Sequence, residues 1–316
     1  MGTPASAVPT LRRCLEDGHE IAAVWTQPDR PSGRGNRLAA PPVKEFALQR
    51  GLTVHQPAKI RTEEARELFA SHRADAAVVV AYGRILPTPL LDAPRLGCVN
   101  VHFSLLPKYR GAAPVNWAIA RGESVSGVTT MRIEEGLDTG AIYLQRATPI
   151  GDEETAPELL ARLSEMGADL LSETLARIDS LAARPQPDEG ATHAPILGRE
   201  DGLIDWARAA ADIERRVRGF QPWPNAHTIF RGQRFVLWRA RPAETEGVGQ
   251  GETVSAGRAG THAPGEVVAA RGDELTVACG AGTRLRLLEV QAEGKRRMTA
   301  RDFLNGTRVA EGERLG

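Results

Sequence analysis

The residues best suited to chemistry lie in one short stretch of the chain. Asn100 and His102 stand two residues apart within the apolar segment Cys98–His102, which we expect to be a β-strand. Side chains two apart on a strand point to the same face, so an amide and an imidazole would lie side by side. The strand leads into Ser104–Pro107, and in open α/β sheets ligands bind at the carboxyl ends of the strands. The sequence therefore predicts a polar ligand site at this edge.

A second explanation of this pair stays open. A polar pair on a buried strand is costly unless it is hydrogen-bonded. Asn100 and His102 could satisfy one another, or bond to the backbone, within an ordinary core. Taken alone, the two residues are equally compatible with a ligand site and with such a core.

A carboxylate in a glycine-rich turn is the third candidate. Asp138 lies in Glu134–Gly140, where two glycines bracket it between two β-type segments. Such a turn can bring a carboxylate and free backbone groups to a ligand, although a plain turn with a solvated aspartate is the commoner case. Imidazole and carboxylate groups are those most used for proton transfer in enzymes, so this turn is a candidate part of the same site.

Arginines gather in a stretch near the amino end. Residues 29–44 carry Arg30, Arg34, Arg37 and Lys44 against one aspartate, and Pro and Gly keep the stretch irregular. Arginine suits phosphate contacts because its planar guanidinium can bind two oxygens at once. A solvated basic loop is the alternative, and it is the commoner explanation for such a stretch.

The first half of the chain alternates β-type runs with helical stretches. The β-type runs are Ile21–Trp25, Ala76–Ala81, Cys98–His102, Gly127–Ile133 and Ile142–Ile150, and the helical stretches include Glu63–Ala70 and Thr155–Leu181. A continuous apolar run such as AAVVVA is typical of a strand buried on both faces, as in a parallel sheet. The alternation predicts an α/β domain.

The chain changes character after residue 181. Residues 182–200 are rich in Pro, Gly and polar residues, and we interpret them as a linker. A helical stretch follows, and then come short β-type runs: Ala226–Phe230, Arg234–Ala240, Gly265–Ala270, Glu274–Cys279 and Arg284–Gln291. This pattern predicts a small, mostly antiparallel barrel. We therefore expect a domain over residues 1–181, a linker over 182–200 and a barrel domain over 201–316.

Composition excludes several classes of protein. The 316 residues are 41% hydrophobic and 25% charged, with 40 basic and 40 acidic side chains. A globally basic nucleic-acid binder is therefore not indicated, and no apolar run approaches the roughly 18 residues of a membrane span. Three cysteines lie far apart and show no metal spacing. We expect a cytoplasmic protein without a bound metal.

The chain starts at a turn rather than at a strand. A parallel α/β domain normally opens with an apolar strand that leads into its first glycine turn, but only Met1 precedes Gly2-Thr3-Pro4. We expect Met1 to be an internal residue of the natural protein, preceded by a strand of about six mostly apolar residues. The alternative is a sheet that is built differently.

Together these elements resemble the methionyl-tRNA formyltransferase family over essentially the whole chain. The resemblance is carried by GTPASAVPTL, TQPDRPSGRG, AYGRILP, NVHFSLLPKYRGAAPVNWAI, GVTTMRIEEGLDTGAI, DGLIDW, RRVRGFQPWPNA, PGEV and LLEVQAEGKRRM followed by DFLNG. The N-x-H…SLLP and LDTG motifs are shared by folate-dependent N-formyltransferases, whereas QPDRPSGRG and the barrel segments are more selective for the tRNA enzymes. The resemblance implies a Rossmann-like parallel-sheet formyltransferase domain followed by an OB-like β-barrel domain that binds tRNA.

The resemblance also implies the role of each site residue. Catalysis falls on Asn100, His102 and Asp138. Folate contacts fall on Ser104, Leu105, Leu106, Pro107, Tyr82 and Gly83. Contacts to the tRNA acceptor stem fall on Arg30, Arg34, Arg37 and Lys44. Two positions depart from the family pattern, because Ser6 stands where an aromatic residue is usual and Asn36 where a lysine is usual.

The implied reaction transfers the formyl group of 10-formyltetrahydrofolate to the α-amine of methionyl initiator tRNA. Protonated His102 and the Asn100 amide would stabilise the oxyanion, an effect worth about 3–4 kcal/mol for one donor. Asp138 would orient His102 and help to move the proton. We expect a monomer that needs no metal and no membrane. Two alternatives remain: a formyltransferase acting on a sugar nucleotide or on glycinamide ribonucleotide, and a non-catalytic RNA-binding relative.

Overall fold

The computed structural model describes residues 1–32, 37–243 and 262–316. The chain divides into two compact units. The first comprises residues 1–115, 125–150 and 158–195, and the second comprises residues 116–124, 151–157 and 196–316. Among the described residues, none of the helices combines the length and the apolar character that crossing a bilayer needs.

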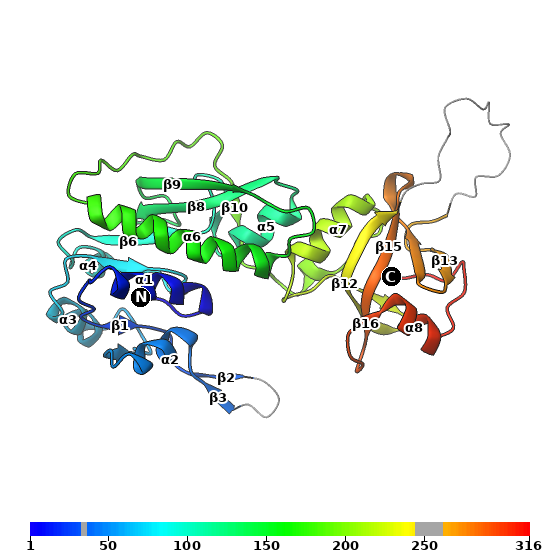
Figure 1. Ribbon diagram of the computed structural model, residues 1–316, viewed down its shortest axis with the longest axis horizontal. Helices are drawn as coiled ribbons and strands as arrows, with labels where there is room; N and C mark the ends of the chain where they lie inside the picture. Colours follow the sequence, from blue (N-terminus) through cyan, green and yellow to red (C-terminus); the bar gives the residue numbers. More distant parts are fainter. Residues whose placement is uncertain (33–36, 244–261) are drawn as a thin grey trace. The chain divides into compact units, whose positions relative to one another are not determined.

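Six strands form the centre of the first unit (Figure 1). They are β1 (Val24–Trp25), β4 (Val54–His55), β5 (Ala77–Val79), β6 (Cys98–His102), β8 (Val125–Arg132) and β9 (Ile142–Pro149). β1 pairs with β4, and β5 with β6, in parallel, whereas β8 and β9 extend the sheet in antiparallel fashion. Gly2 joins the two parallel pairs, because its N–H donates to the Trp25 carbonyl at 2.9 Å and it forms a parallel bridge with Val80. The Rossmann-like α/β core is confirmed.

Helices cover this sheet. α1 (Val8–Glu16) and α6 (Ala156–Arg177) lie side by side (Figure 1), and ion pairs from α1 to Glu165 and Asp169 join them. α6 approaches β6 closely at Gly167, where an added Cβ would lie only 2.7 Å from Val101. The remaining helices of this unit are α2 (Pro42–Gln49), α3 (Glu63–Ser71) and α4 (Thr88–Leu91). α3 begins at Thr62, whose side chain accepts the Ala65 N–H as an N-cap.

Two short pairs of strands flank the sheet. β2 (Arg30–Ser32) and β3 (Arg37–Ala39) form an antiparallel hairpin. β7 (Arg110–Gly111) pairs in parallel with β10 (His193–Ala194), which comes from the Pro-rich segment 182–200. Gly111 has a φ of 122°, and an added Cβ would lie 2.5 Å from the Ala194 carbonyl oxygen, so this contact requires glycine.

An antiparallel sheet forms most of the second unit. Its order is β11-β12-β15-β14-β13, with β16 paired to β15. These strands are β11 (His227–Phe230), β12 (Gln233–Ala243), β13 (Val267–Arg271), β14 (Glu274–Ala278), β15 (Arg284–Ala292) and β16 (Met298–Thr299). The sheet closes into a small barrel because Leu315 N–H donates to Gly265 and Gly316 N–H donates to Ile229, which lies in β11.

The barrel core is aromatic and aliphatic. Phe230, Phe235 and Phe303 pack together with ring centroids 5.0–6.1 Å apart. Phe303 comes from α8 (Ala300–Gly306), which begins at the N-cap Thr299. α5 (Pro114–Ala120) meets the end of α7 (Ala210–Gly219), where Trp117 and Phe220 make an edge-to-face contact at 5.4 Å.

Candidate active site

The strand β6 carries Asn100 and His102 toward the carboxyl edge of the sheet. His102 is buried, and its Nε2–H donates to the Tyr109 carbonyl at 2.9 Å. Its Nδ1 faces Oδ2 of Asp138 at 3.7 Å. At this separation the two atoms are not hydrogen-bonded, so the Nδ1 edge of the ring stays available to a ligand beside the carboxylate. The structure thus brings together the histidine and the aspartate that the sequence places 36 positions apart.

Asp138 is held from several directions. Its Oδ2 accepts the Gly111 N–H at 2.8 Å, and only 18% of its side chain is exposed. Its φ of 54° lies in the left-handed region, which few residues other than glycine, asparagine and aspartate adopt. Gln186 stabilises this turn because its Nε2 donates to the carbonyls of Asp138 and Gly140, both at 2.8 Å. The carboxylate is therefore oriented before any substrate arrives.

Asn100 differs from an ordinary core asparagine. It is half-buried, and among the hydrogen bonds of the described residues none involves its side-chain amide. His102 does bond to the backbone, but not to Asn100. The two donors are therefore not satisfied by one another, and the Asn100 amide is available to a ligand.

The loop Ser104–Pro107 is fixed by side chains beneath it. Ser104 is buried and donates from Oγ to the Lys108 carbonyl at 2.7 Å. Thr129 of β8 accepts the Leu106 N–H and donates to the Ser104 carbonyl, and Gln145 donates to the Leu106 carbonyl at 2.8 Å. Leu106 itself packs in a small buried cluster. Leu105 and Pro107 are half-buried, so these two side chains and the loop backbone are what a ligand can reach.

Tyr82 and Gly83 follow β5, which ends beside β6 at the same edge. Tyr82 is 2% exposed, and its carbonyl accepts hydrogen bonds from Thr3 and Gln27. Burial raises the pKa of its phenol. Gly83 is exposed with a φ of 80° and open space on its Cβ side. Gly83 is therefore the accessible member of this pair, and Tyr82 belongs to the core.

The four basic residues expected to contact tRNA have different surroundings. Arg30 is exposed in β2, and Arg37 stands opposite Ser32 in the hairpin. Arg34 lies outside the described residues. Lys44 differs from the arginines, because its Nζ forms an ion pair with Asp29 at 2.7 Å.

The Asp29 carboxylate joins two groups at the base of the hairpin. Gln56 donates to it at 2.7 Å, and Lys44 contacts both of its oxygens. The hydrogen bond from Gln56, followed by that from Lys44, lowers the pKa of the Asp29 carboxyl group. Lys44 thus positions the hairpin in the structure.

Several residues of the site are not evident from sequence patterns. The backbone carbonyl of Tyr109 accepts the hydrogen bond from His102 Nε2–H, and Gln186 connects the Asp138 turn to Arg110, whose Nε donates to Gln186 at 3.0 Å. Thr129 and Gln145 support the Ser104–Pro107 loop from neighbouring strands. Tyr109 acts through its own carbonyl, and the side chains of Gln186, Thr129 and Gln145 bond mainly to backbone groups, so no sequence motif marks these residues. The one available signal is the burial of a polar residue within a β-type run, as for Thr129.

Comparison with known proteins identifies the family of this chain. Residues 1–175 match the family model described as formyl transferase, and residues 196–308 match the formyl transferase C-terminal domain. A methionyl-tRNA formyltransferase from Solibacter usitatus is 52% identical over 100% of this chain and 97% of its own length. The corresponding protein from Koribacter versatilis is 50% identical over the same shares. The chain belongs to the methionyl-tRNA formyltransferase family.

Solved structures of more distant formyltransferases share the fold. An N-formyltransferase from Helicobacter canadensis, in complex with folinic acid and dTDP-3-aminofucose, has a TM-score of 0.64 and 17% identity, over 92% of this chain and 97% of its own. A sugar 3N-formyltransferase with dTDP and 5-N-formyl-THF gives 0.63 and 19%, over 93% and 97%. At this identity the likeness concerns the fold alone. The methionyl-tRNA formyltransferase relatives, by contrast, match at about half of all positions.

Proposed function

We propose that this protein transfers the formyl group of 10-formyltetrahydrofolate to the α-amine of methionyl initiator tRNA. The observation that carries the proposal is the His102–Asp138 pair, with Asn100 two residues before His102 on the same strand, at the carboxyl edge of β5 and β6. Membership of the methionyl-tRNA formyltransferase family supports the choice of acceptor. The product would be N-formylmethionyl-tRNA, which serves translation initiation.

The residues at this edge suit a folate formyl donor. The Asn100 amide takes part in none of the hydrogen bonds of the described residues, Gly83 is open to solvent, and the Ser104–Pro107 loop is braced from below. A few fixed polar groups that set the orientation of a ligand are usual in a cofactor site. When bound, the folate supplies the formyl carbon, and the residues of this chain orient that group and manage the charge.

Each member of the trio has a separate task in this reaction. Attack of an amine on a formyl carbon places negative charge on the carbonyl oxygen, and the Asn100 amide and the His102 imidazolium can donate to it. Asp138 lies close enough to His102 to balance its positive charge and to hold the ring in one orientation. As the new bond to the amine forms, the bond between the formyl carbon and the folate nitrogen would break, and these groups would help to move the proton from the amine to that nitrogen. Holding both substrates in register adds an entropic advantage.

We infer that the tRNA is held by its phosphates. Arg30 is exposed in β2, and Arg34 and Arg37 follow it in the same basic stretch of the sequence, so this stretch offers positive charge for phosphate contacts. The barrel unit, residues 196–316, offers a second surface for the same ligand. Phosphate contacts release counterions, so binding of tRNA should weaken steeply as salt concentration rises.

One set of assays tests the proposal. The protein is incubated with 10-formyltetrahydrofolate and, in parallel, with methionyl initiator tRNA, a UDP-amino sugar or glycinamide ribonucleotide. Formylation of the tRNA alone supports the proposal. Preference for either small acceptor would replace it with another folate-dependent N-formyltransferase. Tight tRNA binding without formylation of any acceptor would make the protein a non-catalytic RNA-binding relative.

A further inference from the structure

The segment that ends at residue 195 is built into the first unit next to the active site. Thr192 lies directly before β10, and β10 pairs in parallel with β7. One edge of β7 bonds to this segment. The Arg110 N–H donates to the Thr192 carbonyl at 2.9 Å, and the Ala112 N–H donates to the Ala194 carbonyl at the same distance. The segment therefore aligns β7 along its length.

The other edge of β7 bonds to the two ionisable residues of the active site. The Tyr109 carbonyl accepts the Nε2–H of His102 at 2.9 Å. Two positions further along, the Gly111 N–H donates to Oδ2 of Asp138 at 2.8 Å. Backbone groups on alternate residues of a strand point to opposite edges. β7 thus lies between β10 and the His102–Asp138 pair, so its placement sets the placement of both side chains.

Tyr109, which holds the imidazole, has an unusual backbone conformation. Its φ is 63°, in the left-handed region that bulky residues rarely adopt. Its N–H donates to Oγ1 of Thr192 at 2.9 Å, and the residue is buried. Thr192 also donates its own N–H to the Pro107 carbonyl at 3.3 Å. Thr192 is therefore bonded to the backbone on both sides of Tyr109, and its hydroxyl holds the Tyr109 N–H itself.

The Tyr109 carbonyl selects which nitrogen of His102 carries hydrogen. A carbonyl oxygen can only accept, so Nε2 is the protonated nitrogen. In a neutral imidazole the other nitrogen is then the acceptor, and here that nitrogen is Nδ1, which lies 3.7 Å from Oδ2 of Asp138. If the Tyr109 carbonyl turned away, the ring would lose this preference.

We propose that Thr192 is a positioning residue for His102. Its hydroxyl holds the Tyr109 N–H, the Tyr109 carbonyl holds the imidazole in the Nε2–H form, and Nδ1 is left to face the reacting groups. This inference rests on the function proposed above, because it concerns the orientation of His102 in formyl transfer. It gives the segment before residue 195 a part in the chemistry, although its composition is that of a linker.

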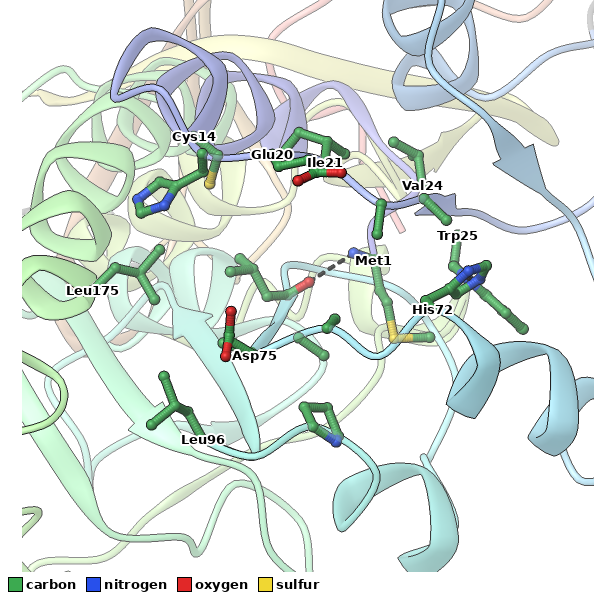
Figure 2. Close-up of a pocket in the computed structure, with 18 of the residues that line it drawn as sticks. Met1, Cys14, Glu20, Ile21, Val24, Trp25, His72, Asp75, Leu96 and Leu175 are labelled. Carbon is green, nitrogen blue, oxygen red and sulfur yellow. Dashed lines mark hydrogen bonds between the residues drawn. The ribbon is translucent and has the colours of Figure 1, made fainter.

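A cavity elsewhere in the first unit provides the control for a purely structural effect. Its volume is about 500 Å³, and Leu175 of α6 is one of the residues around it (Figure 2). None of the described residues that line it belongs to the active site. Leu175→Ala enlarges this cavity, so it should lower the thermal midpoint and leave the hydrogen bonds of His102 in place.

The experiment compares Thr192→Val, Thr192→Ser and Leu175→Ala with the wild-type protein. Valine is close to threonine in shape but lacks the hydroxyl, whereas serine keeps it. One readout is kcat and KM for formylation of methionyl-tRNA. The other is the tautomer of His102, taken from the nitrogen NMR signals of isotope-labelled histidine at alkaline pH, where histidine side chains are ordinarily neutral. His102→Asn identifies the signals of that residue among the seven histidines.

Thr192→Val should lower kcat roughly 10- to 100-fold with KM within about twofold of wild type. It should also convert His102 from the Nε2–H form to a mixture of the two tautomers. Thr192→Ser should restore both properties. Leu175→Ala should change neither, although it lowers the thermal midpoint. If Thr192→Val does not fold, Thr192→Ala gives the same comparison with serine.

Two results would overturn the proposal. One is a His102 that lacks the Nε2–H form in the wild-type protein or keeps it in folded Thr192→Val. The other is a loss of kcat that serine does not restore or that Leu175→Ala reproduces, which would make the effect one of stability. A wild-type protein that formylates no acceptor would overturn the proposed function instead. The NMR signals do not depend on formyl transfer, so the two failures are distinguishable.

Discussion

Replacement of Asp138 by asparagine removes one charge from the active site and little else. Asparagine has nearly the shape of aspartate, and its Oδ1 can still accept the Gly111 N–H that Oδ2 accepts at 2.8 Å. The turn keeps the two hydrogen bonds from Gln186, which go to backbone carbonyls. The fold should therefore survive, and the change should act on the charge opposite His102.

The expected loss follows from the separation of the two groups. Opposite unit charges 3.7 Å apart attract by about 4 kcal/mol at an effective dielectric constant of about 20. Both side chains are mostly buried, at 7% and 18% exposure, so screening by solvent is limited. If this attraction stabilises the imidazolium in the transition state, its loss lowers kcat by roughly 10²–10³-fold. The KM for methionyl-tRNA should change little.

Single-turnover formylation of methionyl-tRNA measures this loss directly. Asp92→Asn, an exposed aspartate of the same unit, is the matched control and should keep wild-type turnover. Thermal unfolding of both variants shows whether the fold is intact. A folded Asp138→Asn protein with kcat within about threefold of wild type would refute the charge-balance argument and remove Asp138 from the chemistry.

Three further predictions concern positioning, tRNA binding and pH. Gln186→Leu should loosen the Asp138 turn and lower kcat roughly 10- to 100-fold while leaving the KM for tRNA unchanged. A variant with a lower thermal midpoint, in which kcat and KM both worsen, would show that Gln186 has only a structural role. Arg30→Ala should raise the KM for tRNA and reduce the slope of log K against log salt by about one, whereas Arg50→Ala should not; identical salt slopes in the two variants would make Arg30 an ordinary surface residue. The pKa of the Met1 amino group is lowered from 8.0 to about 6 in the fold, so the unfolded chain binds more protons between these values and stability should rise with pH across this window, by at most about 2–3 kcal/mol. Urea unfolding of the 316-residue protein at pH 6 and pH 8 measures this, and an acetylated sample that shows the same rise would assign it to other groups.

Much of the fold follows from local patterns in the sequence. The run at residues 76–81 and the strand Cys98–His102 were predicted because buried parallel strands must be continuously apolar, and they appear as β5 and β6. The long helix at Thr155–Leu181 appears as α6 over Ala156–Arg177. Its apolar stripe was visible because 22 residues contain several helical turns.

Shorter elements gave too little pattern to predict. α1 and α2 span nine and eight residues, and each has Pro in its first turn. The strand pair β7–β10 joins residues more than 80 positions apart, and its hydrogen bonds involve backbone groups that any sequence carries. The segment 182–200 therefore has the sequence character of a linker, although its residues up to 195 belong to the first unit and Gln186, Thr192 and Ala194 form hydrogen bonds within it.

The same distinction explains which part of the active site the sequence revealed. Asn100 and His102 were found because a polar pair on a buried strand contradicts the local apolar pattern. Asp138 needed the family resemblance, since a carboxylate between two glycines is common in solvated turns. The structure supplies what makes that carboxylate different, namely the Gly111 N–H that fixes it and the Gln186 amide that fixes its backbone. These partners arise only when β7, β8 and the segment after residue 182 come together, so the charge that completes the site depends on tertiary contacts rather than on any motif.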